Sequence, residues 1–234
     1  MKMLENKWAL VTGASRGIGR QIAKGLSERK CNLILHARKK ENLTKIKEDL
    51  SESGIQIHCV EAELSDSKAL DKMVKEIMEN IGAIDILYNN AAIMSKYKED
   101  FFSISIEHYK EIFEVNVWAV IKLCSEFAPQ MREKKWGRII NVTSGIENQP
   151  QLAPYSISKA AIDKYTKDIA GELKKDNVLV NLLDPGWLKT DLGGKNAWFE
   201  VETVLPGALV PALLDDYSTA GELFRAQDYK MLER

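Results

Sequence analysis

The sequence predicts an α/β protein built as a single doubly wound, Rossmann-type parallel sheet with helices on both faces. Short apolar runs rich in β-branched residues alternate with longer stretches of helical periodicity, which is the order that βαβ units require. The apolar runs are continuous, as expected for parallel strands that are buried on both sides. The first run, at residues 8–11, leads into a glycine-rich segment at residues 13–19, which opens an amphipathic stretch. This layout places the N–H groups of a helix N-terminus against a phosphate.

The strands are expected where the apolar runs lie, at residues 8–11, 32–36, 56–60, 84–88, 138–142 and 178–183, with a short strand at 223–224. Helices are expected where the periodicity is helical, at residues 17–28, 41–52, 67–81, 106–131, 155–174 and around 201–214. No repeat or Pro/Gly-rich linker divides the chain. Residues 1–234 are therefore expected to form one dinucleotide-binding and catalytic domain, in which the less regular residues 187–215 provide a substrate loop and helix.

The composition argues against several classes of partner. A hydrophobic content of 45% supports a full core. A net charge of −1 argues against a nucleic acid or an anionic membrane as the main partner. No signal-peptide pattern and no apolar stretch of membrane-spanning length is found. Cys31, Cys59 and Cys124 lie far apart in apolar surroundings, so free thiols in a reducing cytoplasm are expected, with no metal site.

Gly13, Gly17 and Gly19 mark the cofactor end of the expected sheet. Their spacing is G-x-x-x-G-x-G, which differs from the G-x-G-x-x-G dinucleotide fingerprint. Glycine is needed where the backbone takes positive φ or approaches another group closely. A tight strand–helix connection is the alternative to a nucleotide site, and the place of the turn after the first strand favours the nucleotide.

The end of the second predicted strand indicates the cofactor type. It continues as Arg38-Lys39-Lys40, with no acid before Glu41. NAD sites usually place a carboxylate here for the ribose 2′-hydroxyl, whereas NADP needs a cation for the 2′-phosphate. Arg38 can contact a phosphate through two N–H groups, and Arg16 can flank it. The sequence therefore favours NADP(H) over NAD(H); a solvated helix start is the alternative.

Tyr155 and Lys159 are the candidate catalytic pair. They lie four residues apart on a predicted helix and so share one face. A phenol titrates near ~10, and a neighbouring ammonium is expected to lower that pKa toward neutrality. Ser144 ends an apolar run, and the loop at residues 145–154 is short enough to keep it close.

Taken together, these motifs resemble the short-chain dehydrogenase/reductase family across essentially the whole chain. The matching features, in the family's order, are residues 12–19, Asn89-Asn90-Ala91-Ala92, Asn116, Ser144, Tyr155-x-x-x-Lys159, and Pro185-Gly186 followed by Thr190. The resemblance implies the doubly wound fold, hydride chemistry on a CH–OH or C=O group, and pairing into homodimers or homotetramers through the two long central helices.

The resemblance also implies roles for single residues. Tyr155 donates a proton to the carbonyl oxygen in reduction, Ser144 hydrogen-bonds that oxygen, and Lys159 holds the nicotinamide ribose. Asn116 is where the proton-relay asparagine falls, although a buried mid-helix asparagine also needs partners for structural reasons. Asn89 is expected beside the adenosine and Thr190 at the carboxamide. The cofactor-binding residues implied are Gly13, Ser15, Arg16, Gly17, Ile18, Gly19, Arg38, Glu63, Leu64, Asn89, Ala91, Tyr155, Lys159, Pro185, Gly186, Leu188 and Thr190.

The substrate is indicated only by class. Residues expected to face it are mostly apolar, as in small-molecule pockets generally: Ile93, Met94, Glu147, Gln149, Trp187, Leu192, Trp198 and Phe199. For Trp198 and Phe199, a core or subunit contact is the alternative. The sequence indicates an NADPH-dependent reductase of a hydrophobic aldehyde or ketone. A 3-oxoacyl thioester reductase, an alcohol or sugar dehydrogenase, and an NADP(H)-sensing protein without turnover are the alternatives.

Overall fold

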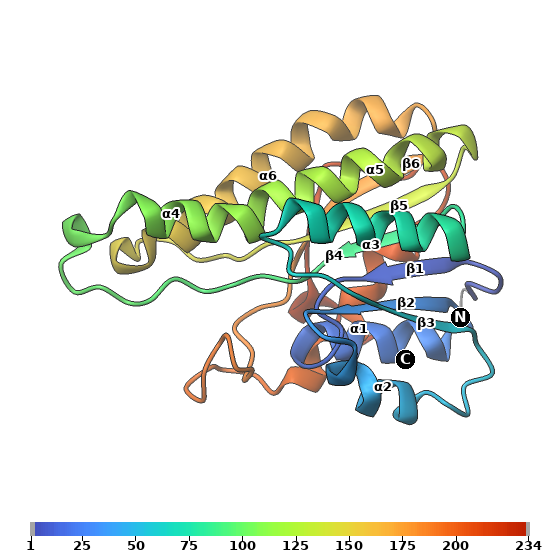
Figure 1. Cartoon of the computed structure of the whole chain (residues 1–234), viewed down its shortest axis with the longest axis horizontal. Helices are drawn as coiled ribbons and strands as arrows, with labels where there is room; N and C mark the ends of the chain where they lie inside the picture. Colours follow the sequence, from blue (N-terminus) through green and yellow to red (C-terminus); the bar gives the residue numbers. More distant parts are fainter. Residues whose placement is uncertain (1–2, 233–234) are drawn as a thin grey trace.

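The computed structural model describes residues 3–232, which form an all-parallel sheet of seven strands in the order β3-β2-β1-β4-β5-β6-β7 (Figure 1). The strands are β1 (Trp8–Val11), β2 (Asn32–Ala37), β3 (Ile57–Glu61), β4 (Ile86–Asn89), β5 (Gly137–Val142), β6 (Val178–Asp184) and β7 (Leu223–Arg225). The chain crosses from the β3 edge back to the centre after β3, so the sheet is doubly wound. The predicted fold class is confirmed.

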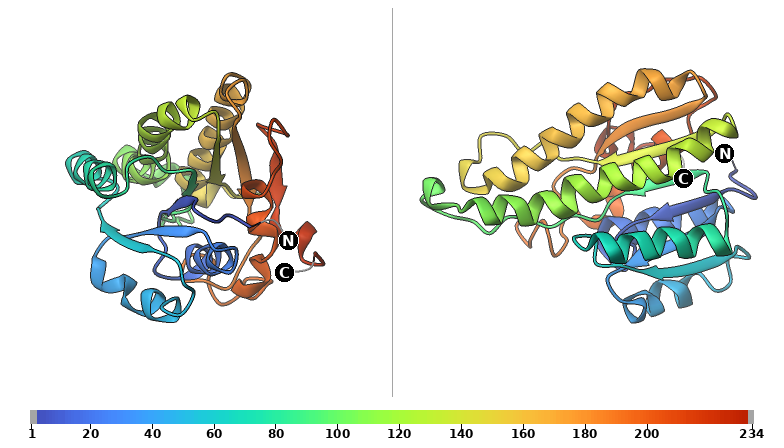
Figure 2. Two further views of the ribbon diagram at one scale, coloured as in Figure 1. Left: turned by 90° about the vertical axis from the view of Figure 1, so that its right-hand side faces the viewer. Right: turned by 45° about the horizontal axis from the view of Figure 1, so that its top comes forward.

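Helices cover both faces of this sheet (Figure 2). They are α1 (Gly17–Glu28), α2 (Thr44–Asp49), α3 (Ser67–Asn80), α4 (Ile106–Phe113), α5 (Ala119–Glu133) and α6 (Ala153–Lys174). On one face, α1 and α2 bury residues such as Ile22 and Ile46 in a first core; on the other, α3, α5 and α6 bury residues such as Ile77 and Phe127 in a second core. None of the helices in the described part of the chain is long and apolar enough to cross a membrane.

The predicted long helix at 106–131 is interrupted. The chain runs through α4, a π-helical turn η3 (Glu114–Trp118) and α5 as one rod in which the turn carries Asn116. Single π-turns inside α-helices are often found at functional sites. The rod runs alongside α6, and its α4 end projects beyond the sheet (Figure 1).

Two other helix predictions were partly wrong. The segment expected to be helical at 41–52 begins as the 3₁₀ turn η1 (Lys40–Leu43) and is α-helical only in α2. The helix expected around 201–214 consists of two 3₁₀ turns, η5 (Val201–Val204) and η6 (Gly207–Ala212). Pro206 separates them and Pro211 lies inside η6; each proline removes a backbone donor, which prevents a continuous α-helix.

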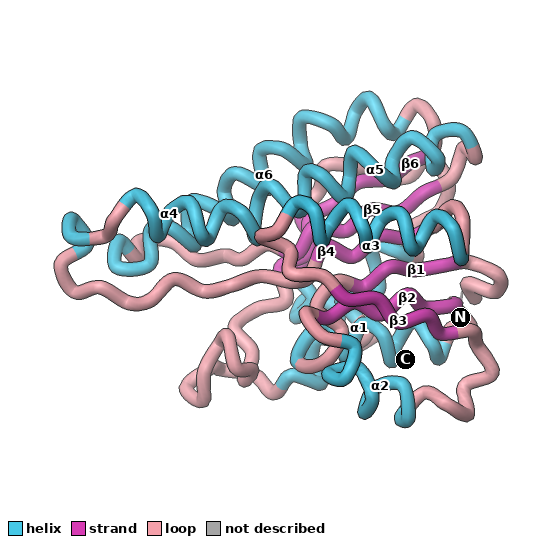
Figure 3. The backbone as a smooth tube through the Cα atoms, in the orientation of Figure 1, coloured by secondary structure: helices cyan, strands magenta, loops and turns pink. Residues whose placement is uncertain are grey.

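The remaining short turns lie beside the site edge or the C-terminus: η2 (Phe101–Ser103), η4 (Pro150–Leu152) and η7 (Ala226–Tyr229). The strands are parallel, so the segments that follow β1, β4, β5 and β6 leave the sheet at one edge, where ligands of such sheets bind. Figure 3 shows the long loops at this edge, between β4 and α4 and after β6.

Candidate active site

The glycine turn (residues 13–19) has the backbone conformation that its glycines were expected to permit. Gly13 and Gly17 have φ of 67° and 56°, in the left-handed region that favours glycine. A Cβ on Gly19 would lie 2.3 Å from the Gly13 carbonyl oxygen, so only glycine lets α1 start this close to the turn.

The N-terminus of α1 fits a phosphate group. No side chain caps this helix, and its first turn holds no acidic residue. The first N–H groups of a helix have no partner within the helix and carry a partial positive charge. A dinucleotide pyrophosphate therefore matches the donors that α1 presents beside the glycine turn.

Hydrogen bonds between Thr12 and Asn90 connect the glycine turn to the segment after β4. Asn90 Nδ2 donates to the Thr12 carbonyl oxygen at 2.8 Å, and the Thr12 hydroxyl accepts from the backbone N–H groups of Asn90 and Ala91 at 2.9 and 3.0 Å. Sequence reasoning missed these roles, although Asn90 stood inside a recognised motif.

The side chain of Asn89 makes hydrogen bonds within the protein. It is buried and donates to Asn141 Oδ1 at 2.8 Å and to the Cys124 sulfur at 3.4 Å. It therefore ties β4 to β5 and α5.

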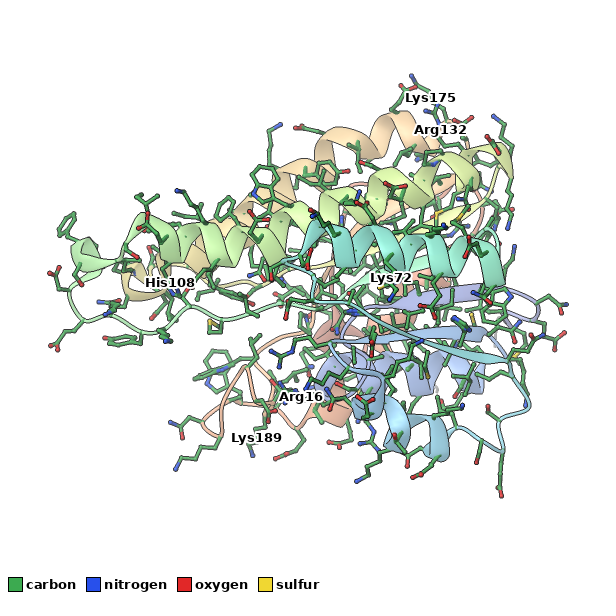
Figure 4. All side chains as sticks on the ribbon, in the orientation of Figure 1. Arg16, Lys72, His108, Arg132, Lys175 and Lys189 are labelled. Atoms are coloured by element: carbon green, nitrogen blue, oxygen red, sulfur yellow. The ribbon has the colours of Figure 1, made fainter. Side chains whose placement is uncertain are left out.

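At the expected ribose end, the two arginines differ. Arg38 is exposed and forms no ion pair with any described residue. Arg16 is paired instead, with Nη1 at 2.7 Å from Asp191 Oδ2. Figure 4 shows Arg16 beside the loop that carries Lys189. Glu63 is exposed and Leu64 is buried at the end of β3.

Ser144, Tyr155 and Lys159 come together at the edge of β5 and the first turns of α6. Ser144 hydrogen-bonds the Tyr155 side chain. The Lys159 ammonium donates to the Val142 carbonyl oxygen at 2.7 Å and lies 5.6 Å from the centre of the Tyr155 ring. An ammonium has three donors, so two remain for a hydroxyl-bearing ligand or the phenol.

Burial sets the charge states of this pair. It raises the pKa of Tyr155 to about 12, against a lowering effect of the Ser144 hydrogen bond. It lowers the pKa of Lys159 to about 8, against the opposing charge of Asp163. The expected lowering of the tyrosine pKa by the lysine was therefore wrong, because desolvation disfavours both charged forms.

Asn116 connects the β4–α4 loop to α6. Its amide accepts from Ile93 N at 2.9 Å and donates to Ile93 O at 3.0 Å and to Ser158 Oγ at 3.1 Å. Ser158 in turn donates to the Tyr155 carbonyl oxygen at 2.7 Å, and Tyr155 N donates to Ser95 Oγ at 2.8 Å. These hydrogen bonds satisfy the buried side chain of Asn116, as a mid-helix asparagine requires.

The turn and loop after β6 carry a second group of the predicted cofactor-binding residues. Gly186 has φ of 81°, and Gln227, from the C-terminal segment, donates to the Pro185 carbonyl oxygen at 3.0 Å. Thr190 lies against Gly17, where a Cβ would meet its methyl carbon at 3.5 Å, and its hydroxyl accepts from Gly193 N at 3.0 Å. Thr190 thereby brings the 187–199 loop to the glycine turn. Leu188 is buried beneath it.

Asp184 is a site residue that sequence reasoning missed. Its carboxylate accepts from Gly186 N at 2.9 Å, and a Cβ on Gly145 would lie 3.1 Å from its other oxygen. Its charge also acts to raise the pKa values of Tyr155 and Asp163. The signal was present in the sequence as an acid that ends an apolar strand.

The expected substrate residues divide by exposure. Trp187 and Trp198 stack edge to face with centroids 5.4 Å apart, and Trp198 is 75% exposed. Phe199 instead packs against the first core, which was the alternative weighed for it. Met94 is half-buried, and Ile93, Glu147, Gln149 and Leu192 are exposed. Among the described residues, no cluster of three or more His, Cys, Asp or Glu could hold a metal ion, and the three cysteines are unpaired.

Comparison with known proteins agrees with this arrangement. The sequence model described as short chain dehydrogenase matches residues 7–199. The chain is 33% identical over 192 residues to the 3-oxoacyl-(acyl-carrier-protein) reductase FabG of Aquifex aeolicus, covering 81% of this chain and 77% of that protein.

Solved structures match over almost the whole chain. A short-chain type dehydrogenase/reductase from Mycobacterium marinum is similar with a TM-score of 0.86 at 24% identity, covering 99% of this chain and 98% of that one. A 3-oxoacyl (acyl-carrier-protein) reductase from Agrobacterium tumefaciens with NADP bound has a TM-score of 0.83 at 25% identity, covering 95% and 93%.

Proposed function

This chain belongs to the short-chain dehydrogenase family and is an NAD(P)-dependent oxidoreductase acting on CH–OH or C=O groups, and we propose that it reduces a hydrophobic aldehyde or ketone with NADPH. The observation that carries the proposal is the junction of Ser144, Tyr155 and Lys159, which lies at the same edge of the parallel sheet as the glycine turn. A binding protein without turnover has no need of this junction.

The proposed roles follow from the charge states of these residues. Burial keeps the Tyr155 phenol protonated at neutral pH, which is the form that donates a proton to a carbonyl oxygen. Ser144 hydrogen-bonds the same oxygen and stabilises the charge that develops there. Lys159 holds ribose hydroxyl groups with its remaining donors. When bound, the nicotinamide cofactor supplies the hydride. Asn116 keeps the first turn of α6 in place through Ser158.

The preference for NADPH rests on Arg38. Its exposed guanidinium has no ion-pair partner among the described residues, and no acid stands at the end of β2 to accept a ribose 2′-hydroxyl. Ser15, Ile18, Ala91, Glu63, Leu64 and the wall of Pro185, Gly186, Leu188 and Thr190 are the remaining proposed cofactor contacts. Tighter NADPH than NADH binding in a fluorescence titration supports this assignment; the reverse order overturns it.

Replacing Tyr155 by phenylalanine tests the function directly. The variant retains NADPH binding and loses most of its turnover, by about 10³-fold, if the phenol donates the proton. Turnover equal to that of the wild type would contradict the proposed role. A protein that binds NADPH but reduces no member of a carbonyl panel would contradict the enzyme proposal and favour a sensor.

The 187–215 segment is proposed to line the substrate site within a single domain of residues 1–234. Its exposed Trp187 and Trp198 offer apolar surface on the loop that follows β6, which suits a medium-sized apolar carbonyl compound. A strong preference for small dianionic substrates would overturn this assignment of substrate class.

A 3-oxoacyl thioester reductase is the second candidate, favoured by the identity of 33% to FabG of Aquifex aeolicus. Acyl-carrier thioesters and free ketones of equal chain length separate the two, because only a carrier-dependent enzyme discriminates strongly between them. An alcohol or sugar dehydrogenase would instead show faster oxidation than reduction.

The enzyme is also proposed to act in the cytoplasm as a homodimer or homotetramer. The unpaired cysteines suit a reducing compartment. The exposed Ile106, Trp118 and Ile157 on the α4–α5 rod and α6 supply apolar surface for a second copy. Analytical ultracentrifugation tests the assembly; a monomer at micromolar concentration would contradict it.

A further inference from the structure

His36 lies buried directly beneath the glycine turn. It is the fifth residue of β2 and is 2% exposed, although β2 ends at the edge where the cofactor is proposed to bind. A buried polar side chain must be hydrogen-bonded to be tolerated, and the partners of His36 connect three strand ends.

Besides the backbone pairing of β2 in the sheet, three hydrogen bonds join His36 to its surroundings. The backbone N–H of Gly13 donates to Nδ1 at 3.2 Å, and Nε2 pairs with the Ala62 carbonyl oxygen at 3.1 Å. The His36 carbonyl oxygen accepts from Ala14 N at 2.9 Å. His36 therefore holds Gly13 and Ala14 of the glycine turn. The His36 ring is itself held by Ala62, which follows β3.

These partners fix the protonation state of the ring. Gly13 N–H can only donate, so Nδ1 must accept, and the proton lies on Nε2, which donates to the carbonyl oxygen of Ala62. The imidazolium form has two N–H donors and would set Nδ1–H against the Gly13 N–H. Burial lowers the pKa of His36, with the Ala62 hydrogen bond and the charge of Glu63 acting in the opposite direction.

We propose that neutral His36 is a positioning residue for the cofactor, holding the glycine turn in its binding conformation and loosening it when the ring is protonated. The inference rests on the proposed function, since it concerns the same NADPH site. His36 contacts the turn rather than the cofactor, so its effect is on affinity.

The charged groups around His36 bear on its titration. Glu63 faces it from the segment after β3. On the glycine turn, Arg16 points to Asp191, and on its own strand the following Arg38 is exposed. Phosphates bound at the α1 N-terminus would favour the imidazolium, whereas the Gly13 N–H opposes it. If the effect of the phosphates is larger, NADPH affinity rises on acidification. If the effect of the Gly13 N–H is larger, NADPH affinity falls.

The experiment measures the NADPH dissociation constant from about pH 4.5 to about pH 8.5, a range that extends below the one in which histidine ordinarily titrates, because burial lowers the pKa of His36. The wild type is compared with His36→Asn, His36→Gln and His108→Asn. Asparagine places its oxygen near the Nδ1 position and cannot titrate, so it keeps the Gly13 contact. Glutamine reaches toward Ala62 instead. His108 lies on α4, far from the glycine turn (Figure 4), and is the matched control.

The proposal predicts that His36→Asn binds NADPH like the wild type at about pH 8. On acidification, His36→Asn should lose less NADPH affinity than the wild type. His36→Gln binds about tenfold more weakly at every pH, as expected for one lost hydrogen bond. His108→Asn follows the wild type. The 2′-phosphate of NADPH also titrates near ~6, but it does so equally in every variant, so the ratio between variants isolates His36.

Two outcomes overturn this inference and leave the proposed function standing. In the first, acidification weakens NADPH binding by His36→Asn as much as by the wild type. In the second, the wild type gains NADPH affinity on acidification relative to His36→Asn. Circular dichroism at each pH keeps loss of fold separate, and the His36→Asn comparison stands if His36→Gln does not fold. If the wild type binds neither NADPH nor NADH at about pH 8, the proposed function fails, and this inference fails with it.

Discussion

The glycine turn and the 187–199 loop meet at the same edge of the sheet, yet they are held by different forces. The turn is fixed by backbone geometry and by contacts with Thr12, His36 and Asn90. The loop is closed by backbone hydrogen bonds such as Lys189 N to Phe199 O at 2.8 Å. Its outer side carries the exposed ion pairs Arg16–Asp191 and Lys189–Glu200 and two exposed tryptophans.

The difference separates positions where a substitution is expected to be costly from positions where it is expected to be tolerated. Buried hydrogen bonds and close backbone approaches tolerate little change, whereas exposed ion pairs contribute little to stability. We therefore expect substitutions in the buried half to affect cofactor binding or catalysis strongly. Substitutions of exposed side chains in the loop should shift substrate and cofactor preference with little cost in stability.

Lys159→Met should give the largest effect. Turnover is expected to fall by about 10³-fold because the phenol and the ribose lose their cation. The measurement is single-turnover reduction with saturating NADPH, with Lys164→Met as the control, since Lys164 is exposed on the same helix. Turnover within about tenfold of the wild type would contradict the role of Lys159.

The same variant should be more stable than the wild type at neutral pH. Burial lowers the pKa of Lys159 to about 8, so the buried ammonium destabilises the folded protein at lower pH. Between about 8 and the unfolded value near ~10.4, the folded protein loses this proton first, and wild-type stability rises with pH. Lys159→Met should therefore gain roughly 1–3 kcal/mol in the free energy of unfolding at pH 7, and less at pH 10. Urea unfolding at both pH values tests it; equal gains would count against the titration.

Gly19→Ala should give the second largest effect. Its Cβ would lie 2.3 Å from the Gly13 carbonyl oxygen, so the turn must move, and NADPH affinity should fall about a hundredfold. Gly171→Ala is the control, because a Cβ there has no neighbour within 4 Å. Calorimetric titration measures both; an unchanged affinity in Gly19→Ala would show that the close approach is dispensable.

Trp198→Ala probes the other side of the comparison. The side chain is 75% exposed, so the melting temperature should stay unchanged, while KM for an apolar carbonyl substrate rises by up to about tenfold. Phe199→Ala should do the opposite, because Phe199 packs on the first core; it should cost about 2 kcal/mol of stability. Thermal unfolding and initial-rate kinetics distinguish them. A Trp198→Ala variant with the wild-type KM would remove Trp198 from the substrate site.

Asp191→Asn should give the smallest effect. The substitution removes the ion pair of Arg16, so the Arg16 guanidinium becomes available to a 2′-phosphate. NADPH affinity should rise by about two- to fivefold, the range of an exposed ion pair, with NADH affinity unchanged. Asp168→Asn, at an exposed pair on α6, is the control. An equal rise in NADH affinity would show that the Arg16–Asp191 ion pair affects the loop and not the binding of the 2′-phosphate.

Prediction from sequence succeeded where a local rule dictates the outcome. Continuous apolar runs gave the strands of the sheet, and the φ angles of Gly13 and Gly17 are those that glycine was expected to permit. It failed at the helix expected around 201–214, which Pro206 and Pro211 break for a local reason. It also did not foresee that the Asn89 side chain turns to Asn141 and Cys124, partners that lie far away in the chain.

The sequence by itself determined the fold class, the place of the glycine turn and the candidate pair Tyr155 and Lys159, because these depend on local periodicity, backbone freedom and helical spacing. Only the tertiary structure decided the charge states of that pair, the engagement of Arg16 by Asp191 and the place of His36 beneath Gly13. Desolvation and hydrogen bonding depend on which segments are brought together from far apart in the chain, and no local pattern encodes that.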